Sequence, residues 1–379
     1  MIKLVIDENI AFASKAFNDF GNVLLLPGRK ISNSMLQDTD ILIVRSITKV
    51  DEELLLNTSV KFVGTATIGT DHIDLDYLEK NQIAFADAKG CNAFSVAEYV
   101  FAAILNLAIR FDFQLKNKSI GIVGVGNVGS KVAAFAEAFG MKVLLNDPPL
   151  KRKGDKGNFV ELEEILGCDI ITLHTPLNQT GIDKTYHMFN ESNLNLLKDD
   201  AILINSSRGA VIDNSDLLKL VGRKKLKSVL DVWENEPNIN IDLLKKVLIA
   251  TPHIAGYSYE GKVNGTKMIY EELCNFLNRE KTFSFEIASP ENPFRKLDQS
   301  LKLEVTLDSL FKSIYSITND DYNMRKMILM NEEERITEFD LQRKKYQIRR
   351  EFNNYRIFQE NLDKTQIRLL NKLRFNIID

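Results

Sequence analysis

The sequence is poor in the residues that mark secreted, membrane-spanning or nucleic-acid-binding proteins. Three cysteines in 379 residues, all far apart, are too few for a disulfide framework or a zinc site, and we expect no metal site. No run approaches the roughly 18 consecutive apolar residues that a membrane helix needs. The net charge is −3, so neither nucleic acid nor an anionic membrane is an expected partner. The N-terminal segment has no signal-peptide pattern, so we expect a cytoplasmic protein.

Glycine and proline are absent from the last 86 residues, which follow Pro293. Because these two residues punctuate turns, this part of the chain is expected to turn with Asn, Asp and Lys instead. The shift in composition predicts a domain boundary near residue 285. Acidic residues are interleaved with the basic residues of this tail, which favours a solvated helix face over a nucleic-acid patch. The basic residues are Lys344, Lys345, Arg349 and Arg350.

Short apolar runs alternate with helical patterns through most of the chain, which is typical of parallel strands joined by crossover helices. Two such blocks, 1–90 and 119–253, predict an α/β protein. The six strands of the second block suit a doubly wound sheet. The predicted strands are Leu4–Ile6, Ile41–Val44, Phe62–Thr65, Ile83–Ala86, Ile120–Val123, Lys142–Asn146, Ile170–Leu173, Ala201–Asn205, Ser228–Asp231 and Leu248–Ala250.

Two long helical patterns flank the second block. Residues 92–111 are almost apolar all round, so we expect this helix to be buried. Glu98 stands three residues after Ser95, as in a capping box. Residues 258–280 predict a second helix, which leads the chain back towards the first block.

A glycine-rich motif, Gly124-x-Gly126-x-x-Gly129, follows a predicted strand and opens a predicted helix. That context is the one a dinucleotide site requires, because the helix N-terminus offers free N–H groups to a pyrophosphate. Asp147 ends the next strand, 18 residues after Gly129. A carboxylate there accepts hydrogen bonds from the ribose hydroxyls and repels a 2′-phosphate, so NAD is favoured over NADP. The alternative is that the glycines only shape a turn and Asp147 only caps a helix.

Three residues with catalytic chemistry follow predicted strands of the second block: Arg208, Glu236 and His253. Open α/β sheets bind ligands beyond the carboxyl ends of their strands, so these side chains are candidates for one site. Histidine suits the base that accepts a hydroxyl proton while hydride leaves for a nicotinamide, and a nearby Glu would orient the ring. Arginine suits a substrate carboxylate. Together they predict oxidation of a 2-hydroxy acid or reduction of a 2-oxo acid.

The motifs GIVGVGNVGS, HTPL, INSSRG, DVWENEP and TPHIAG resemble those of the D-isomer-specific 2-hydroxyacid dehydrogenases, and the resemblance spans nearly all of residues 1–285. It implies a Rossmann-type NAD domain, 96–254, inserted into a flavodoxin-like split substrate domain, 1–95 and 255–285. It also implies a C-terminal α+β dimerisation domain, 286–379, and therefore a homodimer.

Within the family, the stretches VRSITKV, KFVGTATIGTDHID, KGCNAFSVAEYVF, NDPP and HIAGYSYEGK resemble the branch that oxidises 4-phospho-D-erythronate at C2 with NAD, a step of pyridoxal 5′-phosphate biosynthesis. That likeness implies His253 as general acid/base, Glu236 as its partner and Arg208 as carboxylate anchor. It implies substrate contacts at Ser46, Thr67 and Tyr257, to which we add Arg45, with a structural ion pair as the alternative for Arg45. The implied NAD contacts are Gly124, Gly126, Asn127, Val128, Gly129, Asp147, Thr175, Ser206, Ser207, Arg208, Asp231 and Gly256.

Two other functions stay open at this point. A sister dehydrogenase acting on 3-phosphoglycerate or a simple 2-hydroxy acid would share the fold and the three catalytic residues. A non-enzymatic NAD-sensing protein would also share them, but it would need a partner-binding motif, and none is evident. The other histidines, His72 and His174, are better explained by packing or structural hydrogen bonds, and His187 is assigned no role.

Overall fold

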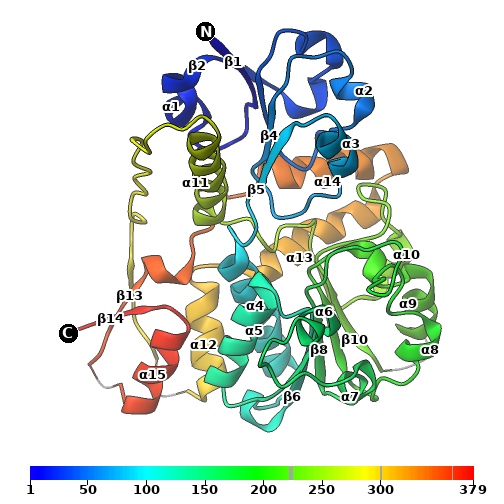
Figure 1. The fold of residues 1–379 in the computed structure, drawn as a ribbon. Coiled ribbons are helices and arrows are strands. Elements are labelled where there is room, and N and C mark those ends of the chain that lie inside the picture. Colours follow the sequence, from blue (N-terminus) through cyan, green and yellow to red (C-terminus); the bar gives the residue numbers. More distant parts are fainter. Residues whose placement is uncertain (222–224, 299–300, 361) are drawn as a thin grey trace. The chain divides into compact units, whose positions relative to one another are not determined.

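The computed structural model describes residues 1–221, 225–298, 301–360 and 362–379, which divide into two compact units. Unit 1 comprises Met1–Asn92 and Ser258–Ala288, and unit 2 comprises Ala93–Tyr257 and Ser289–Asp379. The chain therefore leaves unit 1, returns to it and ends in unit 2 (Figure 1). Residues 289–379, here called the C-terminal segment, group with unit 2, whereas a separate domain was predicted from the sequence for 286–379.

Unit 1 is built on a parallel sheet in the order β2-β1-β3-β4-β5, which is the flavodoxin-like order. Leu4 and Ile6 of β1 pack on one face with α1 and α11, and Val5 packs on the other face with α2 and α3. The sheet is thus covered on both sides, as its apolar strands require. The elements are β1 Ile2–Asp7, α1 Ala13–Phe17, β2 Gly21–Leu26, β3 Ile41–Val44, α2 Glu52–Leu55, β4 Phe62–Thr65, α3 Leu75–Lys80, β5 Ala84–Asp87 and α11 Tyr259–Phe276.

Strand β2 was not predicted from the sequence. It lies at the edge of the sheet and pairs only with β1 among the described strands. Its side chains are half-buried or exposed, whereas those of Ile41–Val44 are fully buried, although Val23–Leu26 is apolar over the same length. The partial exposure of β2 is explained by its edge position.

Unit 2 contains a second parallel sheet, in the order β11-β10-β9-β8-β6-β7. Strand order reverses at β6, which lies between β7 and β8, and this switch point is where doubly wound sheets bind ligands. The strands are β6 Ser119–Val123, β7 Lys142–Asn146, β8 Ile170–Leu173, β9 Ile202–Asn205, β10 Lys227–Leu230 and β11 Ile249–Ala250. The helices are α4 Ala93–Arg110, α5 Asn127–Ala138, α6 Pro148–Arg152, α7 Leu162–Leu166, α8 Glu191–Leu194, α9 Asn214–Val221 and α10 Ile241–Lys246.

Helix α4 is the central helix of unit 2. By length and composition it could cross a membrane, with a mean hydropathy of 1.4, but 78% of its apolar window is buried inside the protein. Its side chains pack with α5, with the sheet and with the C-terminal segment in one apolar core. A helix that is apolar all round is expected in such a buried position.

The C-terminal segment is an α+β arrangement that packs on α4, α5 and β11 through its helices α12, α15 and α13, respectively. Without glycine, it begins two helices with capping boxes at Asn331 and Asp363, and it turns after α15 with Arg374 at a φ of +73°. Its elements are β12 Phe294–Arg295, α12 Leu303–Lys312, α13 Ile317–Arg325, α14 Glu332–Lys344, β13 Arg356–Phe358, α15 Lys364–Lys372 and β14 Asn376–Ile378.

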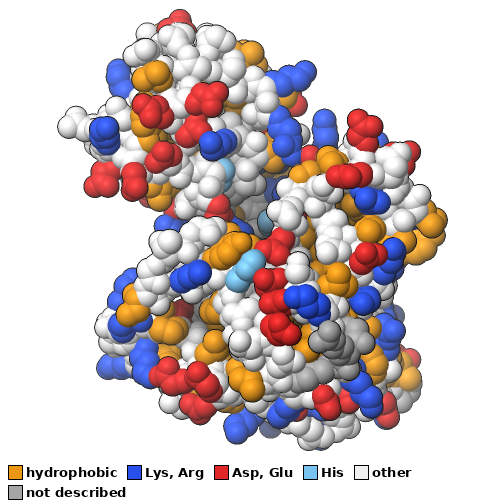
Figure 2. Space-filling view, turned by 90° about the vertical axis from the view of Figure 1, so that its right-hand side faces the viewer, with side chains coloured by type: hydrophobic (Ala, Val, Ile, Leu, Met, Phe, Trp, Pro, Cys, Tyr) orange, Lys and Arg blue, Asp and Glu red, His pale blue; other side chains and the backbone are white. Residues whose placement is uncertain are grey.

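The surface carries both signs of charge. On the face drawn in Figure 2, Lys and Arg side chains are interspersed with Asp and Glu, and no broad basic area is seen there. This matches the nearly balanced content of 49 basic and 52 acidic residues.

Candidate active site

The loop after β6 and the first turn of α5 form the predicted nucleotide cradle. Gly124 has a φ of +85°, which L side chains rarely adopt, and a Cβ on Gly129 would lie 2.0 Å from the carbonyl oxygen of Gly124. A Cβ on Gly126 would meet nothing within 4 Å, so the space beside it is open. Asn127 and Val128 follow as the first residues of α5. The free N–H groups of that first turn suit a pyrophosphate.

Asp147 follows β7 and uses both carboxylate oxygens within the protein. Oδ2 accepts a hydrogen bond of 2.8 Å from Val125 N, and Oδ1 accepts one of 2.9 Å from Leu150 N, which caps α6. A carboxylate has about four lone-pair sites, so accepting ribose hydroxyls is compatible with both bonds. The capping alternative is therefore observed, and it does not exclude the ribose role.

Two predicted cofactor contacts carry buried hydroxyls that have no hydrogen-bond partner among the described residues. They are Thr175 Oγ1, which follows β8, and Ser206 Oγ, which follows β9. Buried polar atoms are nearly always hydrogen-bonded, so both hydroxyls fit a polar ligand such as NAD. Ser207, in contrast, is hydrogen-bonded within the protein, because its N and Oγ donate to Asn205 Oδ1 over 3.1 and 2.8 Å.

Asp231, another predicted cofactor contact, fixes the backbone of residues 253–257, here called the catalytic loop, which includes Gly256. Asp231 is 1% exposed. Its Oδ1 accepts a hydrogen bond of 2.8 Å from Ile254 N, and its Oδ2 accepts one of 2.9 Å from Ala255 N. The structure therefore gives Asp231 a supporting position beneath the loop.

Glu236 and His253 are brought together as an acid–base pair. His253 Nδ1 lies 2.8 Å from Glu236 Oε2, and Trp233 N donates to Oε1 over 2.8 Å. Burial raises the pKa of the Glu236 carboxyl, but His253 and the hydrogen bond from Trp233 outweigh burial, so its pKa lies below the usual value. An ionised Glu236 accepts the Nδ1 proton, which leaves Nε2 of His253 to exchange a proton with a substrate.

Arg208, Glu236 and His253 line one cavity of about 280 Å³ at the carboxyl edge of the sheet in unit 2. The strands that precede them, β9, β10 and β11, are parallel neighbours, which explains why the three loops meet. Arg208 Nη1 donates to Ser207 O over 2.7 Å, so part of its guanidinium is fixed by its own loop. The other lining residues are Leu177, Tyr186, Gly209, Ala210, Trp233, Glu234 and Asn235.

The remaining three histidines occupy other environments. His187 lies within hydrogen-bonding distance of two carboxylates, 3.1 Å from Asp213 and 2.6 Å from Glu234. His174 bonds to a threonine hydroxyl, and burial lowers its pKa to about 3, so its ring stays neutral. His72 Nε2 lies 2.9 Å from a threonine hydroxyl in unit 1. Among the four histidines, His253 combines one bound carboxylate with a place on the cavity.

The predicted substrate contacts in unit 1 follow two neighbouring strands. Arg45 and Ser46 follow β3, and Thr67 follows β4 by two residues, at the same edge of the sheet. Arg45 forms a structural ion pair, which was the alternative to a substrate contact, with its Nε 2.9 Å from Asp7 Oδ2.

Lys262, at the start of α11, was not predicted as a site residue. Burial lowers the pKa of its amine, and the nearby positive charge of Arg45 lowers it further.

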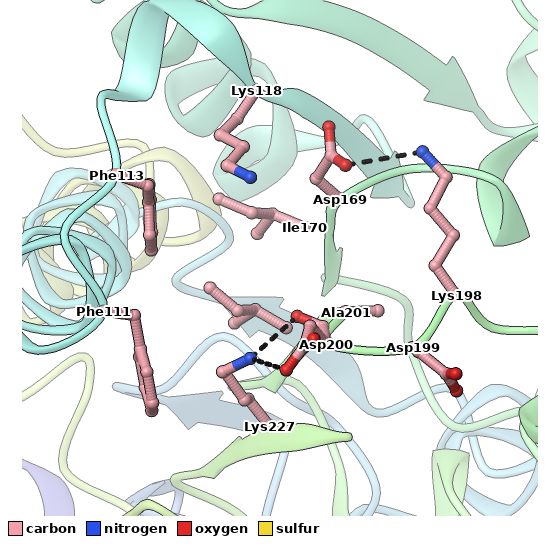
Figure 3. A pocket seen from close by; sticks show the side chains of 11 residues that line it. Phe111, Phe113, Lys118, Asp169, Ile170, Lys198, Asp199, Asp200, Ala201 and Lys227 are labelled. Carbon is pink, nitrogen blue, oxygen red and sulfur yellow. Dashed lines mark hydrogen bonds and ion pairs between the residues drawn. The ribbon is translucent and has the colours of Figure 1, made fainter. Parts of the chain in front are cut away.

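A second cavity, of about 300 Å³, lies at the opposite, amino edge of the sheet in unit 2. Figure 3 shows Phe111 and Phe113 along one side of it. Its lysines are partly neutralised, since Lys198 pairs with Asp169 and another lysine, Lys227, pairs with a neighbouring aspartate. Ligands of open α/β sheets bind at the carboxyl edge, so this cavity is not assigned to the catalytic reaction.

The C-terminal segment contacts the catalytic loop, which the sequence did not predict. Arg349 Nη1 donates to Ala255 O over 3.1 Å. The ring of Tyr346 packs edge-on against Tyr257, with 5.9 Å between the ring centres. Arg343 also approaches Tyr257, with its guanidinium carbon 5.8 Å from the ring centre. Three long side chains from outside the NAD-domain sequence therefore support this loop.

The prediction that Arg349 lies on a solvated helix face is wrong. Helix α14 ends at Lys344, and Arg349 turns inward until it is only 2% exposed. It lies 3.7 Å from Glu98 of α4, and Arg374 lies 2.9 Å from Glu351, so these four residues form a buried ion cluster. Burial, followed by the charge of Glu351, raises the pKa of Glu98.

Metal-binding groups do not gather anywhere in the part of the chain that the structure describes. Among those residues, no three or more His, Cys, Asp or Glu side chains are placed to hold a metal ion. The three cysteines, Cys91, Cys168 and Cys274, are buried and form no disulfide bond with one another.

The chain is similar to known proteins over nearly all of its length. Residues 106–255 match the family described as D-isomer specific 2-hydroxyacid dehydrogenase, NAD binding domain, and residues 287–373 match a domain of unknown function (DUF3410). Erythronate-4-phosphate dehydrogenase of Proteus mirabilis is 45% identical over 99% of both chains. The enzyme of the same name from Escherichia fergusonii is 44% identical over all of this chain and 99% of its own.

A solved structure with NAD bound is also similar. The 3-phosphoglycerate dehydrogenase of Entamoeba histolytica is 26% identical and has a TM-score of 0.64, over 73% of this chain and 95% of that one. The sequence-based expectations of a Rossmann NAD domain, of NAD as cofactor and of a dehydrogenase are thus confirmed. The chain belongs to the D-isomer specific 2-hydroxyacid dehydrogenase family, in its erythronate-4-phosphate dehydrogenase branch.

Proposed function

We propose that this protein oxidises 4-phospho-D-erythronate at C2 to 2-oxo-3-hydroxy-4-phosphobutanoate with NAD, in pyridoxal 5′-phosphate biosynthesis. The relatives that share 44–45% of its residues over nearly the whole chain carry the name of that reaction. The observation that carries the chemistry is the His253–Glu236 pair, 2.8 Å apart, on one cavity with Arg208.

In the proposed mechanism, NAD held by the glycine loop and Asp147 would supply the acceptor for the hydride of C2. His253 accepts the proton of the C2 hydroxyl at Nε2, while Glu236 holds the Nδ1 proton and stabilises the charged ring. Arg208 binds the substrate carboxylate, because a guanidinium matches two carboxylate oxygens at once. Arg45, Ser46, Thr67 and Tyr257 are proposed to donate hydrogen bonds to the other substrate oxygens.

On the cofactor side, the glycine loop and the N-terminus of α5 would hold the pyrophosphate, and Asp147 would bind the ribose. The unpartnered hydroxyls of Thr175 and Ser206 support further polar contacts with NAD. Asn127, Val128, Ser207, Asp231 and Gly256 complete the proposed NAD-binding set.

NADH formation with three substrates tests the proposal. Purified protein would be offered 4-phosphoerythronate, 3-phosphoglycerate and D-lactate side by side, with and without a 2-oxo acid that can reoxidise bound NADH. Preferential turnover of 4-phosphoerythronate supports the proposal. Preference for 3-phosphoglycerate would assign the chain to a sister reaction, and NAD binding without turnover of any substrate would favour the NAD-sensing alternative.

We also propose a cytoplasmic homodimer formed through residues 286–379, with substrate domain 1–95 plus 255–285 and NAD domain 96–254. Exposed apolar side chains in the C-terminal segment support the dimer, notably Phe294 and Phe358, whose rings stack with centres 5.6 Å apart. Light scattering during size-exclusion chromatography tests it, with F294D/F358D as the variant expected to be monomeric. A monomeric native protein would overturn this part of the proposal.

A further inference from the structure

Arg343 of α14 is a buried cation beside the candidate catalytic residues. Its side chain is 15% exposed. The guanidinium carbon lies 5.8 Å from the ring centre of Tyr257 and 6.0 Å from that of Phe339, and Arg343 forms a side-chain hydrogen bond with Tyr257. It also lies close enough to Glu236 to help hold the pKa of that carboxyl down. A residue of the C-terminal segment thus brings a positive charge to the catalytic loop.

The positive charge of Arg343 is poorly balanced within the protein. Its nearest carboxylate in an ion pair, that of Asp340, lies 3.9 Å from Nη1, and its buried Nε has no hydrogen-bond partner among the described residues. Arg349 also has a buried Nε without a partner among the described residues, but two backbone carbonyls and the carboxylate of Glu98 surround the rest of its guanidinium. A buried guanidinium with an unused donor is costly unless an anion binds to it.

The proposed substrate carries two anionic ends. Arg208 suits the carboxylate, because it lines the cavity together with His253. The phosphate then needs its own cation and hydrogen-bond donors. Arg343 supplies a charge and a free Nε–H, and the Tyr257 hydroxyl beside it can donate a further hydrogen bond.

We propose that Arg343 and Tyr257 form a subsite for the phosphate group of the substrate, so that the C-terminal segment confers preference for a phosphorylated hydroxy acid. This inference rests on the proposed function. The competing explanation is that Arg343 acts only through Glu236, as a positioning residue for the Glu236–His253 pair. The two explanations differ in what happens to a substrate that lacks the phosphate.

The experiment compares R343Q with the native protein on 4-phosphoerythronate and on D-erythronate. Loss of a charge-assisted contact predicts a rise in KM for 4-phosphoerythronate of about 10- to 100-fold, with little change in kcat. The value of kcat/KM for D-erythronate should stay close to native. Inorganic phosphate, used as a competitive inhibitor, should inhibit R343Q about tenfold less well. R343K should recover part of the discrimination, because it keeps the charge.

K344Q is the matched control, because Lys344 is the exposed neighbour on α14. The thermal midpoint and the Kd for NAD show whether each variant is folded. An equal loss with both substrates, or a shifted pH profile with unchanged discrimination, would overturn the phosphate subsite and assign Arg343 to positioning of Glu236. Unchanged kinetics on both substrates would overturn any role.

Failure of the proposed function gives a different result. If the native protein turns over 3-phosphoglycerate and not 4-phosphoerythronate, the substrate assignment fails, and the subsite is tested with 3-phosphoglycerate against D-glycerate. If the native protein turns over neither, the inhibitor arm is replaced by direct calorimetry with inorganic phosphate. Equal binding by native protein and R343Q would then overturn the subsite.

Discussion

Unit 2 holds charged groups in two different surroundings. Those at the carboxyl edge of its sheet are partly exposed to the cavity, whereas those of the ion cluster around Arg349 are largely buried. At the cavity, the His253 and Glu236 side chains are 34% and 19% exposed, and each follows a strand whose neighbours deliver the other groups. In the cluster, Arg349 and Glu98 are 1% and 0% exposed and come from distant parts of the chain. Charges at the ends of parallel strands meet because of the topology, whereas buried charges meet only through tertiary packing. Charged groups at strand ends therefore indicate a candidate active site. Buried charged groups indicate which segments of the chain depend on each other for stability.

Replacing His253, the proposed general base, should give the largest effect and test whether the cavity carries the chemistry. H253N is expected to lower kcat by about 10²- to 10⁴-fold, because a positioned general base contributes that much to a proton transfer. The Kd for NAD should stay near native, as measured by fluorescence titration. H187N is the matched control, since His187 also contacts carboxylates, and its kcat should remain close to native. A native kcat for H253N would remove His253 from the mechanism.

Breaking the buried ion cluster should affect stability instead of chemistry. R349M leaves the carboxylates of Glu98 and Glu351 buried with less positive charge, so the free energy of unfolding should fall by about 3–5 kcal/mol. Urea titration followed by circular dichroism measures this. K345M removes a positive charge from an exposed position and should change the unfolding free energy little. Equal, small losses in both variants would mean that the cluster does not stabilise the fold.

A second buried acid, Asp320, should make the free energy of unfolding depend on pH. Burial raises the pKa of Asp320 to about 6 from its ordinary value of 3.8, although Tyr346 donates it a hydrogen bond of 2.8 Å. The folded protein holds this proton more tightly than the unfolded chain, so the contribution is full below pH 3.8 and is lost as the pH rises through 6. D320N should therefore be more stable than native protein by up to about 3 kcal/mol at alkaline pH.

Urea titrations of D320N and native protein on both sides of this pH range test the sign. The two proteins should have similar stability in acid, where Asp320 is protonated in both states. A native protein that gains stability over D320N on raising the pH would contradict the raised pKa.

Replacing Asp147, the proposed ribose ligand, should give the smallest effect. D147A is expected to weaken NAD binding by about tenfold and to reduce the preference for NAD over NADP, because a charge-assisted hydrogen bond is lost. D147N keeps an acceptor for the Leu150 N–H and removes the charge, so it separates helix capping from cofactor choice. An unchanged ratio of the two Kd values in D147N would refute the ribose assignment.

The sequence predicted the strands of both sheets apart from β2, whether fully buried like β8 or half-buried like β7, because each contains a short apolar run. The runs Ile41–Val44, Phe62–Thr65 and Ile170–Leu173 are strands at the predicted bounds. The three catalytic candidates were found because each follows such a strand. The edge strand β2 was missed although its run Val23–Leu26 is apolar over the same length as Ile41–Val44, because an apolar run this short is ambiguous between a strand and other structure.

Groups whose partners lie far along the chain could not be predicted. The basic residues of the tail alternate with acids, so nothing in the sequence distinguishes the buried Arg349 from the exposed Lys345. Arg343 and Lys262 were missed for the same reason, because their surroundings depend on how separate segments pack. Burial against a specific partner leaves no periodicity in a single sequence.

The contacts of Arg349 with α4 and the catalytic loop limit how this protein can be truncated. A gene fragment that ended near residue 286 would keep α4 but remove the groups that satisfy Glu98 and the Ser95 and Ala255 carbonyls. It would also uncover the apolar side of α4 that packs on α12. Grafting 93–257 onto a relative that lacks this segment would therefore require α4 to be redesigned with a polar outer face. The NAD-binding part of this chain therefore should not be transferred to another protein without the C-terminal segment.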